Sequence, residues 1–508
     1  MIGTVSFSMS ELLSAFGGLM NVSTILMMIL GVTVGIVCGA MPGISCNMAL
    51  IMFLPITFSM QSHEAMTLLL AVYTGGMSGG LVSAILLKIP GTPASVATSF
   101  DGHPMAQKGE AGKALGVGIL SSFIGGVTSC IVLMFLAPAL ANYAMKFGPF
   151  EYLAISIFSL TLIGSLVGDS LIKGMVSALL GMCFSFIGLA PLTSVPRMTF
   201  GYFRLESGIS DVAMLIGIFA IPELIKVATE KIDPDQMEVF KFKKVKGFGI
   251  SMKEYFSHWK NILVSDILGI GIGILPGIGG SIANILAYVT AKKTSKHPEK
   301  FGTGIVDGII APETANNASI GGALVTMLAL GILGSATTAL LIGALSMHGV
   351  QPGPMLFLRE PQLIYTIFAS ILISNLIMIV VETKGINIFA RMLKIPGSIL
   401  LPIVVMMCLV GAYAASYSMY DVACVIVFGL LAFFLEKVGI SLAPMILGFI
   451  IGPMLEVNLQ RALQSSKMDI TPLFTRPISL IFVVITIVSL FWSIFGKQIK
   501  AVIKKTKA

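Results

Sequence analysis

Acids and amides are scarce in the apolar segments of this chain, and one compact group of them could bind a cation. The stretch Asp307-Gly-Ile-Ile-Ala-Pro312-Glu313-Thr-Ala-Asn316-Asn317 places a carboxylate and two adjacent amides at the start of an apolar run. These residues can cap a helix, but together their oxygens also suit a hard cation such as Na⁺, and Glu313 can instead carry a proton. We predict that Glu313, Asn316 and Asn317 bind a coupling ion.

A lone lysine and a nearby acid form a second candidate group. Lys88 lies in an otherwise apolar run, two residues before Pro90. An ammonium group there needs an anionic partner or must extend to polar surroundings, so a substrate carboxylate, Asp101 and simple extension from a helix end all remain open. Asp101 is also a candidate ligand of the coupling ion. Other acids near the ends of apolar segments are interpreted mostly as interface residues: Asp169, Asp211, Glu223, Glu382, Asp421, Glu436 and Glu456.

Four strings of proline and glycine interrupt the apolar runs. A helix that begins at such a break points unpaired amide groups, and the positive end of its dipole, at whatever lies in front of it, which favours an anion. A single hydroxyl near a break is more often a packing residue, but several at matching breaks predict a site. The predicted substrate contacts are Pro42, Gly43, Ser45, Asn47, Lys88, Pro90, Gly91, Thr92, Pro276, Gly277, Gly279, Gly334, Ser335 and Thr337, with Thr98 and Asn284 close by.

The composition indicates which elements must position these residues. Of 508 residues, 56% are hydrophobic and 11% are charged, whereas soluble domains carry about a quarter charged residues, so a soluble enzyme and a disordered chain are both excluded. A membrane crossing takes roughly 20 apolar residues, which allows on the order of 10 to 12 helical elements. We predict an all-α polytopic membrane protein. Its 54 glycines and 23 prolines favour re-entrant or broken helices at the Pro-Gly tips.

The basic residues predict the topology. No Lys or Arg precedes Lys88, whereas lysines gather at 226–260, at 292–300 and in the C-terminal tail. By the positive-inside rule these three segments are cytoplasmic, and the net charge of +8 reflects topology rather than nucleic-acid binding. The apolar stretch 261–290 between two such segments is too short for two crossings. It is predicted to be a re-entrant hairpin with its tip at Pro276-Gly277; one long kinked helix is the alternative.

The chain also contains an internal repeat. Gly39-Ala-Met-Pro42-Gly43-Ile44 matches Gly273-Ile-Leu-Pro276-Gly277-Ile278 at an offset of 234 residues, and the string that begins at Gly79 matches the one that begins at Gly321 at an offset of about 242. Since only the second hairpin has basic flanks, the two halves are predicted to be inverted, as in many secondary transporters. The predicted limits are 1–225 for the first repeat, 226–260 for a basic cytoplasmic linker, 261–495 for the second repeat with extra C-terminal helices, and 496–508 for a basic cytoplasmic tail.

These strings resemble the large membrane subunit, the TctA type, of the tripartite tricarboxylate transporters. The resemblance rests on the strings at 39–44, at 89–98 with Asp101-Gly102 and Lys108-Gly109 after it, at 311–318 and at 349–354, in this order and spacing. It covers nearly the whole chain. The chain differs from the usual pattern at Leu333, where a proline is common, and at Lys88, where a small polar residue is common.

The resemblance implies a secondary active transporter of the bacterial inner membrane that imports small di- and tricarboxylates by Na⁺ or H⁺ symport. It further implies two partners, a small membrane subunit of the TctB type and a periplasmic solute-binding protein of the TctC type, and no cofactor besides the coupling ion.

Two alternatives remain for the function. Transport of another small anion, or a channel, is the first alternative. An intramembrane enzyme is the second, based on Tyr420-Asp421, but the chain lacks the G-x-G-D string, a zinc motif and a phosphate-binding loop.

Overall fold

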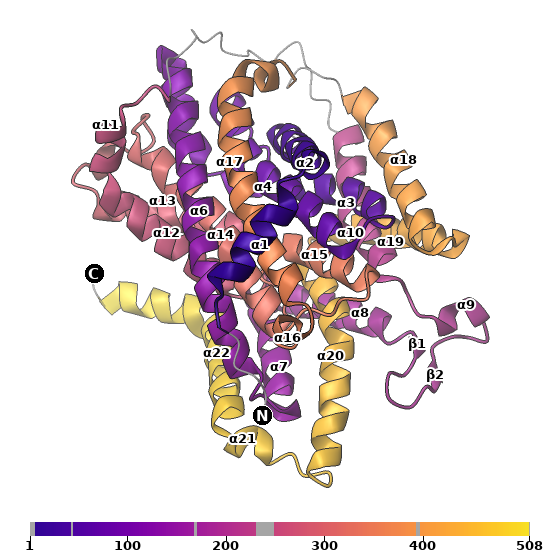
Figure 1. Cartoon of the computed structure of the whole chain (residues 1–508). Coiled ribbons are helices and arrows are strands. Elements are labelled where there is room, and N and C mark those ends of the chain that lie inside the picture. The colour runs from indigo at the N-terminus through magenta and orange to yellow at the C-terminus, as the bar shows by residue number, and fades with distance from the viewer. Residues whose placement is uncertain (1–5, 42–43, 167–169, 230–247, 393–396, 507–508) are drawn as a thin grey trace. The chain divides into compact units, whose positions relative to one another are not determined.

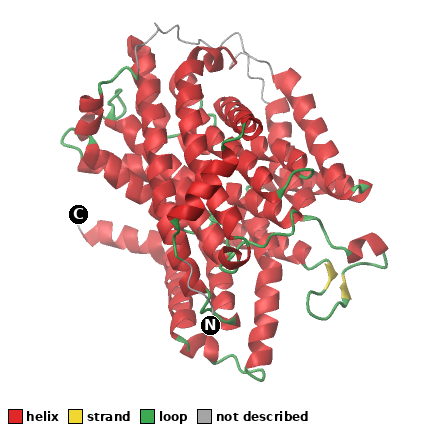
Figure 2. Cartoon of the chain, viewed as in Figure 1, coloured by secondary structure: helices red, strands yellow, loops and turns green. Residues whose placement is uncertain are grey.

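The structure is a computed structural model that describes residues 6–41, 44–166, 170–229, 248–392 and 397–506. Figure 1 shows the arrangement of its elements, and Figure 2 shows that almost all regular structure in it is helical. The exception is a short antiparallel pair, β1 (Gly188–Leu189) and β2 (Pro196–Arg197). Six described helices are long and apolar enough to cross a membrane: Val22–Ala40, Ser62–Leu87, Thr98–Ala144, Pro361–Ile386, Met419–Lys437 and Ala443–Ser465. The predicted all-α polytopic membrane fold is confirmed.

The chain forms two compact units, each made of two segments. The first comprises Met1–Asn142 and Phe219–Ser418, and the second comprises Tyr143–Ile218 and Met419–Ala508. Within the first unit lie α1 (Met9–Leu19), α2 (Val22–Ala40), α3 (Cys46–Thr57), α4 (Ser62–Leu87), η1 (Pro93–Ser95), α5 (Thr98–Met105), η2 (Ala106–Glu110), α11 (Met252–Ser257), α12 (Trp259–Ile274), α13 (Gly279–Thr294), η4 (Pro298–Lys300), α14 (Asp307–Leu330), α15 (Ala336–Met347), α16 (Leu356–Arg359), α17 (Pro361–Met392) and α18 (Gly397–Ser416), with most of α6 (Ala111–Ala144).

Two helices form the centre of the first unit. Residues 65–86 of α4 and residues 308–329 of α14 are all buried. Over these residues neither helix has an exposed face, as expected of helices surrounded by protein on every side. The two contact each other, and the other helices of this unit pack around them.

Glycines allow α2 to lie directly against α4. A side chain at Gly35 or Gly39 of α2 would overlap backbone atoms of Val72 or Gly76, and one at Gly79 of α4 would overlap the carbonyl of Ile36. The spacing of four residues between Gly35 and Gly39 is that of the small-residue motif that brings membrane helices into close contact. The backbone atoms of the two helices therefore meet without intervening side chains.

The second half of the chain repeats this packing. Gly269 and Gly273 of α12 lie against the backbone of Ala315 and Ser319 in α14, and they follow Gly35 and Gly39 by the offset of 234 residues. The order of elements is also shared: α2, α3, α4 and α5 correspond to α12, α13, α14 and α15. Inversion of the halves, and the limits at 225, 260 and 495, stay predictions because shared order does not fix orientation.

The predicted break at Pro276-Gly277 is present. The chain leaves helical geometry between Ile274 and Gly279, and Gly277 has a φ of 77°, which disfavours residues with a side chain. The flanking helices α12 and α13 contact each other and both pack on α14, as a hairpin requires. The matching tip, Pro42-Gly43, lies outside the described residues.

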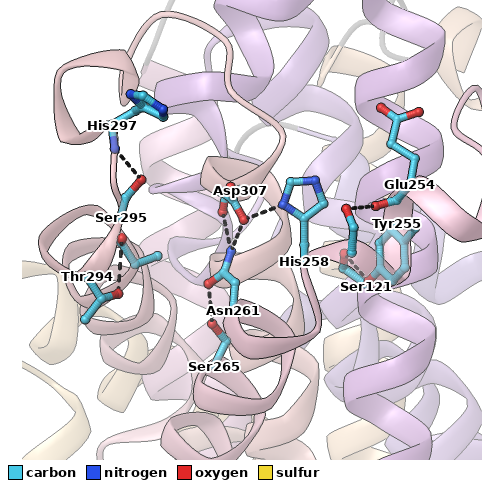
Figure 3. Close-up of polar contacts among 12 residues, drawn as sticks. Ser121, Glu254, Tyr255, His258, Asn261, Ser265, Thr294, Ser295, His297 and Asp307 are labelled. Atoms are coloured by element: carbon cyan, nitrogen blue, oxygen red, sulfur yellow. Dashed lines mark hydrogen bonds and ion pairs between the residues drawn. The ribbon is translucent and has the colours of Figure 1, made fainter.

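Polar contacts fix the first turn of α14, as Figure 3 shows. The Oδ1 atom of Asp307 lies 2.9 Å from Nδ1 of His258 and 2.8 Å from Nδ2 of Asn261. His258 precedes α12 and Asn261 lies in its first turn, so these contacts hold the starts of α12 and α14 together. The hydrogen bond to Asp307 raises the pKa of His258, against the opposing effect of burial.

The second unit contains α7 (Pro149–Leu166), α8 (Leu171–Ser185), α9 (Phe203–Glu206), α19 (Met419–Lys437), α20 (Ala443–Ser465), α21 (Pro472–Thr475) and α22 (Pro477–Thr506). Gly181 and Gly448 again bring two helices, α8 and α20, into backbone contact. The guanidinium of Arg197 donates two hydrogen bonds, of 2.6 and 3.1 Å, to the carboxylate of Glu456. This pair ties the β1–β2 turn to α20.

The glycine packing gives a first prediction. We expect Gly273→Ala to lower the free energy of unfolding by about 1–3 kcal/mol, because its methyl group would overlap backbone atoms of α14. Gly271→Ala is the matched control, since nothing lies within 4 Å of a Cβ at that position of the same helix. Thermal unfolding in detergent measures both. An equal loss for the two variants would contradict the close contact between α12 and α14.

The contact between His258 and Asp307 gives a second prediction. A raised pKa in the folded state means that the protonated histidine stabilises the fold below the ordinary pKa of histidine, and that this contribution disappears as the pH rises through the raised value. We expect wild-type protein to lose on the order of 1 kcal/mol over that window. His258→Gln should remove the pH-dependent part, which unfolding curves at a series of pH values would show. A pH dependence that persists in His258→Gln would assign it to another group.

Candidate functional site

Three helices of the first unit begin close together. Ser45 caps α3 by accepting a hydrogen bond from the amide of Met48, and Ser335 caps α15 in the same way from the amide of Thr338. Asn47 and Thr337 in their first turns are joined by a hydrogen bond of 2.8 Å from the threonine hydroxyl to the amide oxygen. The sequence predicted Ser45, Asn47, Ser335 and Thr337 as substrate contacts, and that role stays a prediction; nothing in the sequence indicated that the two serines cap helices or paired Asn47 with Thr337.

The start of α13 belongs to the same group. A Cβ at Gly279 would lie 3.1 Å from the Cβ of Ser335, and Tyr73 of α4 has its hydroxyl close to the side chains of Ser335 and Thr337. Ser335 and Thr337 are each 7% exposed. The positive ends of α3, α13 and α15 thus converge on a group of hydroxyl and amide side chains, which is an arrangement suited to an anion. We name this group, Asn47, Tyr73, Gly279, Ser335 and Thr337, the N-terminal cluster.

The break that follows α4 packs against both hairpins. Gly91 has no room for a side chain because the carbonyl of Gly39, at the end of α2, lies against it. Thr92 is buried, with its hydroxyl 3.3 Å from that of Ser95. Further along, the amide of Ala97 donates a hydrogen bond of 2.8 Å to the side-chain oxygen of Asn284 in α13.

Contacts at the breaks are therefore reciprocal. The first hairpin reaches the second break, since Asn47 of α3 bonds Thr337 of α15. The second hairpin reaches the first break, since Asn284 of α13 accepts from Ala97. It also touches its own half, because the amide of Gly277 donates to the carbonyl of Gly334 at 3.1 Å. Pro276 and Gly334 are buried at this contact.

Lys88 and Pro90 lie nearer the surface. Lys88 is the C-cap of α4, with a φ of 60°, and its side chain is exposed, whereas Pro90 is partly buried. Of a substrate carboxylate, Asp101 and simple extension from a helix end, the exposed side chain of Lys88 fits extension from the helix end. Contact with a substrate stays a prediction.

Glu313 is fully buried in α14 and is held by two hydroxyls. Thr98 of α5 donates to one carboxylate oxygen at 2.5 Å, and Ser122 of α6 donates to the other at 3.1 Å. Since Asn284 lies within 3.4 Å of the hydroxyl of Thr98, the carboxylate is connected through side chains to the second hairpin. An isolated carboxylate in such a position is costly unless a proton or a cation accompanies it.

The two predicted amides beside Glu313 are buried as well. Asn316 donates from its side-chain nitrogen to the carbonyl of Met77 at 3.1 Å, and Asn317 donates to the carbonyl of Glu313 at 3.2 Å. Within the described part of the chain, the side-chain oxygens of both asparagines have no hydrogen-bond partner. A buried amide oxygen without a donor is destabilising and is available to a cation. Gly280 leaves the space into which the oxygen of Asn316 points.

Asp101 was also predicted to bind the coupling ion, but its carboxylate is surrounded by hydrogen-bond donors of the protein. Its carboxylate accepts hydrogen bonds from the amides of Gly302, Gly304 and Ile305, at 2.7–3.0 Å, and from the hydroxyl of Tyr288 at 2.8 Å. These donors satisfy the buried carboxylate without a cation. Asp101 is thus an anchor for the loop that leads into α14, and its role as an ion ligand stays a prediction.

Several buried polar residues were not among the predicted site residues. Tyr73, Ser122 and Tyr288 carry single hydroxyls inside apolar segments, a weak signal in a sequence. Glu382 was grouped with acids near helix ends that were interpreted mostly as interface residues. In the structure it is 1% exposed, and α17 continues past it to Met392, so an interface position does not hold for Glu382. In the part of the chain that the structure describes, no three His, Cys, Asp or Glu residues come together as metal ligands do.

Comparison with known families identifies the chain. The model of the tripartite tricarboxylate transporter TctA family matches residues 25–447, which include every predicted site residue. The chain belongs to the TctA family. TctA proteins are membrane subunits of tricarboxylate transporters, so the breaks, the N-terminal cluster and Glu313 belong to a transporter subunit that crosses the membrane several times.

Two proteins of Agrobacterium vitis are similar to this TctA protein. An uncharacterized 52.8 kDa protein in the TAR-I ttuC′ 3′ region is 35% identical over 449 residues, which cover 88% of this chain and 89% of the relative. An uncharacterized protein in the TAR-II ttuC′ 3′ region is 38% identical over 208 residues, which cover 41% of this chain and 86% of that relative. No solved structure matches the chain significantly.

The anchoring role of Asp101 gives a third prediction. We expect Asp101→Asn to loosen the loop at 301–306 of this TctA protein, because a neutral amide accepts the three backbone hydrogen bonds less strongly and leaves buried polar groups imperfectly paired. Limited proteolysis of the loop should become faster, and the unfolding free energy should fall by roughly 1–3 kcal/mol. Tyr288→Phe, which removes one donor only, should have the smaller effect. Unchanged proteolysis in Asp101→Asn would contradict the anchor.

Proposed function

We propose that this TctA protein is the large membrane subunit of a binding-protein-dependent system that imports small di- and tricarboxylates across the inner membrane by symport with Na⁺ or H⁺. The observation that carries the proposal is the convergence of three helix N-termini on the N-terminal cluster, beside a buried carboxylate with two amide oxygens that lack donors. The first arrangement suits an anion, and the second suits a cation or a proton.

The substrate carboxylates would bind at the N-terminal cluster. Free amide groups at the starts of α3, α13 and α15, together with the hydroxyls of Tyr73, Ser335 and Thr337, can donate hydrogen bonds to several oxygens at once. The bond between Asn47 and Thr337 would be exchanged for bonds to the substrate. Pro90, Gly91 and Thr92 at the first break would support this site through the hairpins that they contact.

The coupling ion would bind near Glu313. Its carboxylate and the side-chain oxygens of Asn316 and Asn317 lie on consecutive turns of α14, a helix that is buried from residue 308 to residue 329. Either Na⁺ or a proton would compensate the charge of Glu313 in these surroundings. Binding of the ion would therefore favour binding of the anionic substrate, and the reverse, as linkage between two sites requires.

Alternating access would come from movement of the two inverted repeats relative to each other. The reciprocal contacts between the hairpins and the breaks support this part of the proposal, because each half contributes to the surroundings of the other. The basic tail at 496–508 and the linker at 226–260 would face the cytoplasm. A small membrane subunit of the TctB type and a periplasmic binding protein of the TctC type would complete the system and select the solute.

Uptake by the complete system tests the proposal and gives a fourth prediction. Labelled di- and tricarboxylates should accumulate in a saturable way in proteoliposomes that hold the membrane subunits, provided that a binding protein and a Na⁺ or pH gradient are supplied. Uptake that responds to neither gradient would overturn symport, and flux that does not saturate would favour a channel. Saturable uptake restricted to an inorganic anion would favour the alternative of another small anionic solute.

A variant connects uptake to the N-terminal cluster. We expect Thr337→Val to reduce uptake at low substrate concentration by roughly tenfold, since one hydrogen bond to a charged group contributes about 1.5 kcal/mol. Thr294→Val is the matched control, because that hydroxyl donates a hydrogen bond to the carbonyl of Thr290 in its own helix, α13. Equal uptake by the two variants would remove Thr337 from the site.

A further inference from the structure

Glu382 is a further buried carboxylate in the first unit, besides Asp101 and Glu313, and it belongs to none of the contacts described above. It lies in α17 and is 1% exposed. One of its oxygens accepts a hydrogen bond of 2.8 Å from Ser78 of α4. Among the described residues, its other oxygen, Oε1, has no hydrogen-bond partner. A buried charge with a single hydroxyl partner is strongly disfavoured, so the carboxylate must be neutralised in at least one state of the protein.

A line of hydroxyls leads to Glu382 along the contact between α4 and α17. At one end, the hydroxyls of Thr67 and Ser370 lie 2.9 Å apart, and at the other end Ser78 bonds Glu382. The two helices therefore run in the same direction at nearly constant register. Thr74 lies one turn before Ser78 and Ser374 lies one turn beyond Ser370; within the described residues, both hydroxyls are buried without a hydrogen-bond partner. We name Thr67, Ser370, Ser374, Thr74 and Ser78 the hydroxyl seam.

The hydroxyl seam begins near the surface of the unit. Gln61, just before α4, and Pro361 and Gln362, at the start of α17, are exposed, and Thr67 and Ser370 lie within about two turns of them. Successive hydroxyls on one helix face are about 5–6 Å apart, a gap that one water molecule spans. Each hydroxyl both donates and accepts a hydrogen bond, so it can pass a proton, whereas the seam contains no carboxylate that would bind a metal cation.

The charge of Glu313, in α14, also acts on Glu382. Two carboxylates that interact in apolar surroundings do not both stay ionised without a counter-charge. The other titratable groups of α17 and of the helices packed against it lie either at helix ends or in buried segments. Those at helix ends are Glu11, His63, Glu64 and Arg359, and those in buried segments are Cys38, Tyr73, Cys130 and Tyr365. Lys384 follows Glu382 on α17 but is exposed, so none of these residues places a basic side chain beside Glu382.

We propose that Glu382 carries a coupling proton, in addition to the ion that binds near Glu313, and that the hydroxyl seam is the path by which this proton reaches it. The carboxylate takes a proton from hydronium on the side of higher proton concentration and returns it to water on the other side, so protons balance and no further reactant is required. A metal cation is a poorer fit, because such an ion is held by several oxygen ligands at once and Ser78 is the partner that the structure gives Glu382.

This inference rests on the proposed function, since it names a coupling ion of the same transporter. The test uses proteoliposomes with the complete system and compares wild type, Glu382→Gln and Thr383→Val. The glutamine is a permanent mimic of the protonated acid. Thr383 is the neighbouring residue, and its hydroxyl bonds the carbonyl of Ile379 in its own helix, so its variant controls for disturbance of α17.

We expect Glu382→Gln to exchange labelled for unlabelled carboxylate across the membrane at the wild-type rate. It should lose accumulation driven by an inward pH gradient, and its exchange should no longer depend on pH between 5 and 8. Thr383→Val should behave as wild type in every assay. Thr74→Val should slow accumulation at a given pH gradient while leaving exchange unchanged, because it interrupts the hydroxyl seam and keeps the carboxylate.

The outcomes separate failure of this inference from failure of the proposed function. If wild type neither exchanges nor accumulates a carboxylate, the proposed function fails. Wild-type accumulation that follows a Na⁺ gradient alone, or accumulation by Glu382→Gln that still follows the pH gradient, overturns the assignment of the proton to Glu382. Loss of exchange as well as accumulation in Glu382→Gln, with a normal unfolding curve, also overturns it, because the residue would then be needed for substrate binding.

Discussion

The constraint on which the structure depends is that a helix broken in apolar surroundings exposes amide and carbonyl groups that must find partners inside the protein. The chain meets this requirement by packing the broken segments against one another, so that each supplies partners for the other. The amide of Gly277 meets the carbonyl of Gly334, the carbonyl of Gly39 lies against Gly91, and Ser45 and Ser335 cap the helices that restart. These contacts require backbone atoms of different helices to touch, which explains why α2 and α12 carry glycines where they cross α4 and α14.

The same solution produces the candidate site. Helices that restart inside the unit point their amide groups inward, and the side chains that cap them, being short and polar, remain beside those amides. An anion would find donors already in place, with little to reorganise when it binds. The central helices α4 and α14 are buried along nearly their whole length, so the carboxylates and amides that they carry or contact are removed from water. An uncompensated charge in this interior is costly, so an ion that neutralised one of these carboxylates would change the stability of its surroundings strongly.

The sequence was sufficient for the parts of this arrangement that depend on neighbours along the chain. Proline and glycine predicted the breaks, and the asparagines next to Glu313 predicted a polar group on one helix. The pairings that it did not predict depend on which helices meet. Asn47 is paired with Thr337 over 290 residues and Ser78 with Glu382 over 304, and Asp101 serves a loop about 200 residues away. A periodic pattern says which face of a helix is polar but does not say which helix will lie against it, so Glu382 was only grouped with acids near helix ends.

Of the described acids in residues 261–495, the two least exposed, Glu313 and Glu382, are both held by hydroxyls from residues 1–225. Glu313 of α14 accepts from Thr98 and Ser122, and Glu382 of α17 accepts from Ser78. A hydroxyl donates more strongly to an ionised carboxylate than to a neutral one, so neutralising either acid weakens a contact between residues from different halves. If the two halves move relative to each other, as proposed, these same hydrogen bonds would break or re-form. The charge on the two acids and the relative position of the halves would then be coupled through three hydroxyl contacts, and ion binding would be linked to a change of access without a separate device.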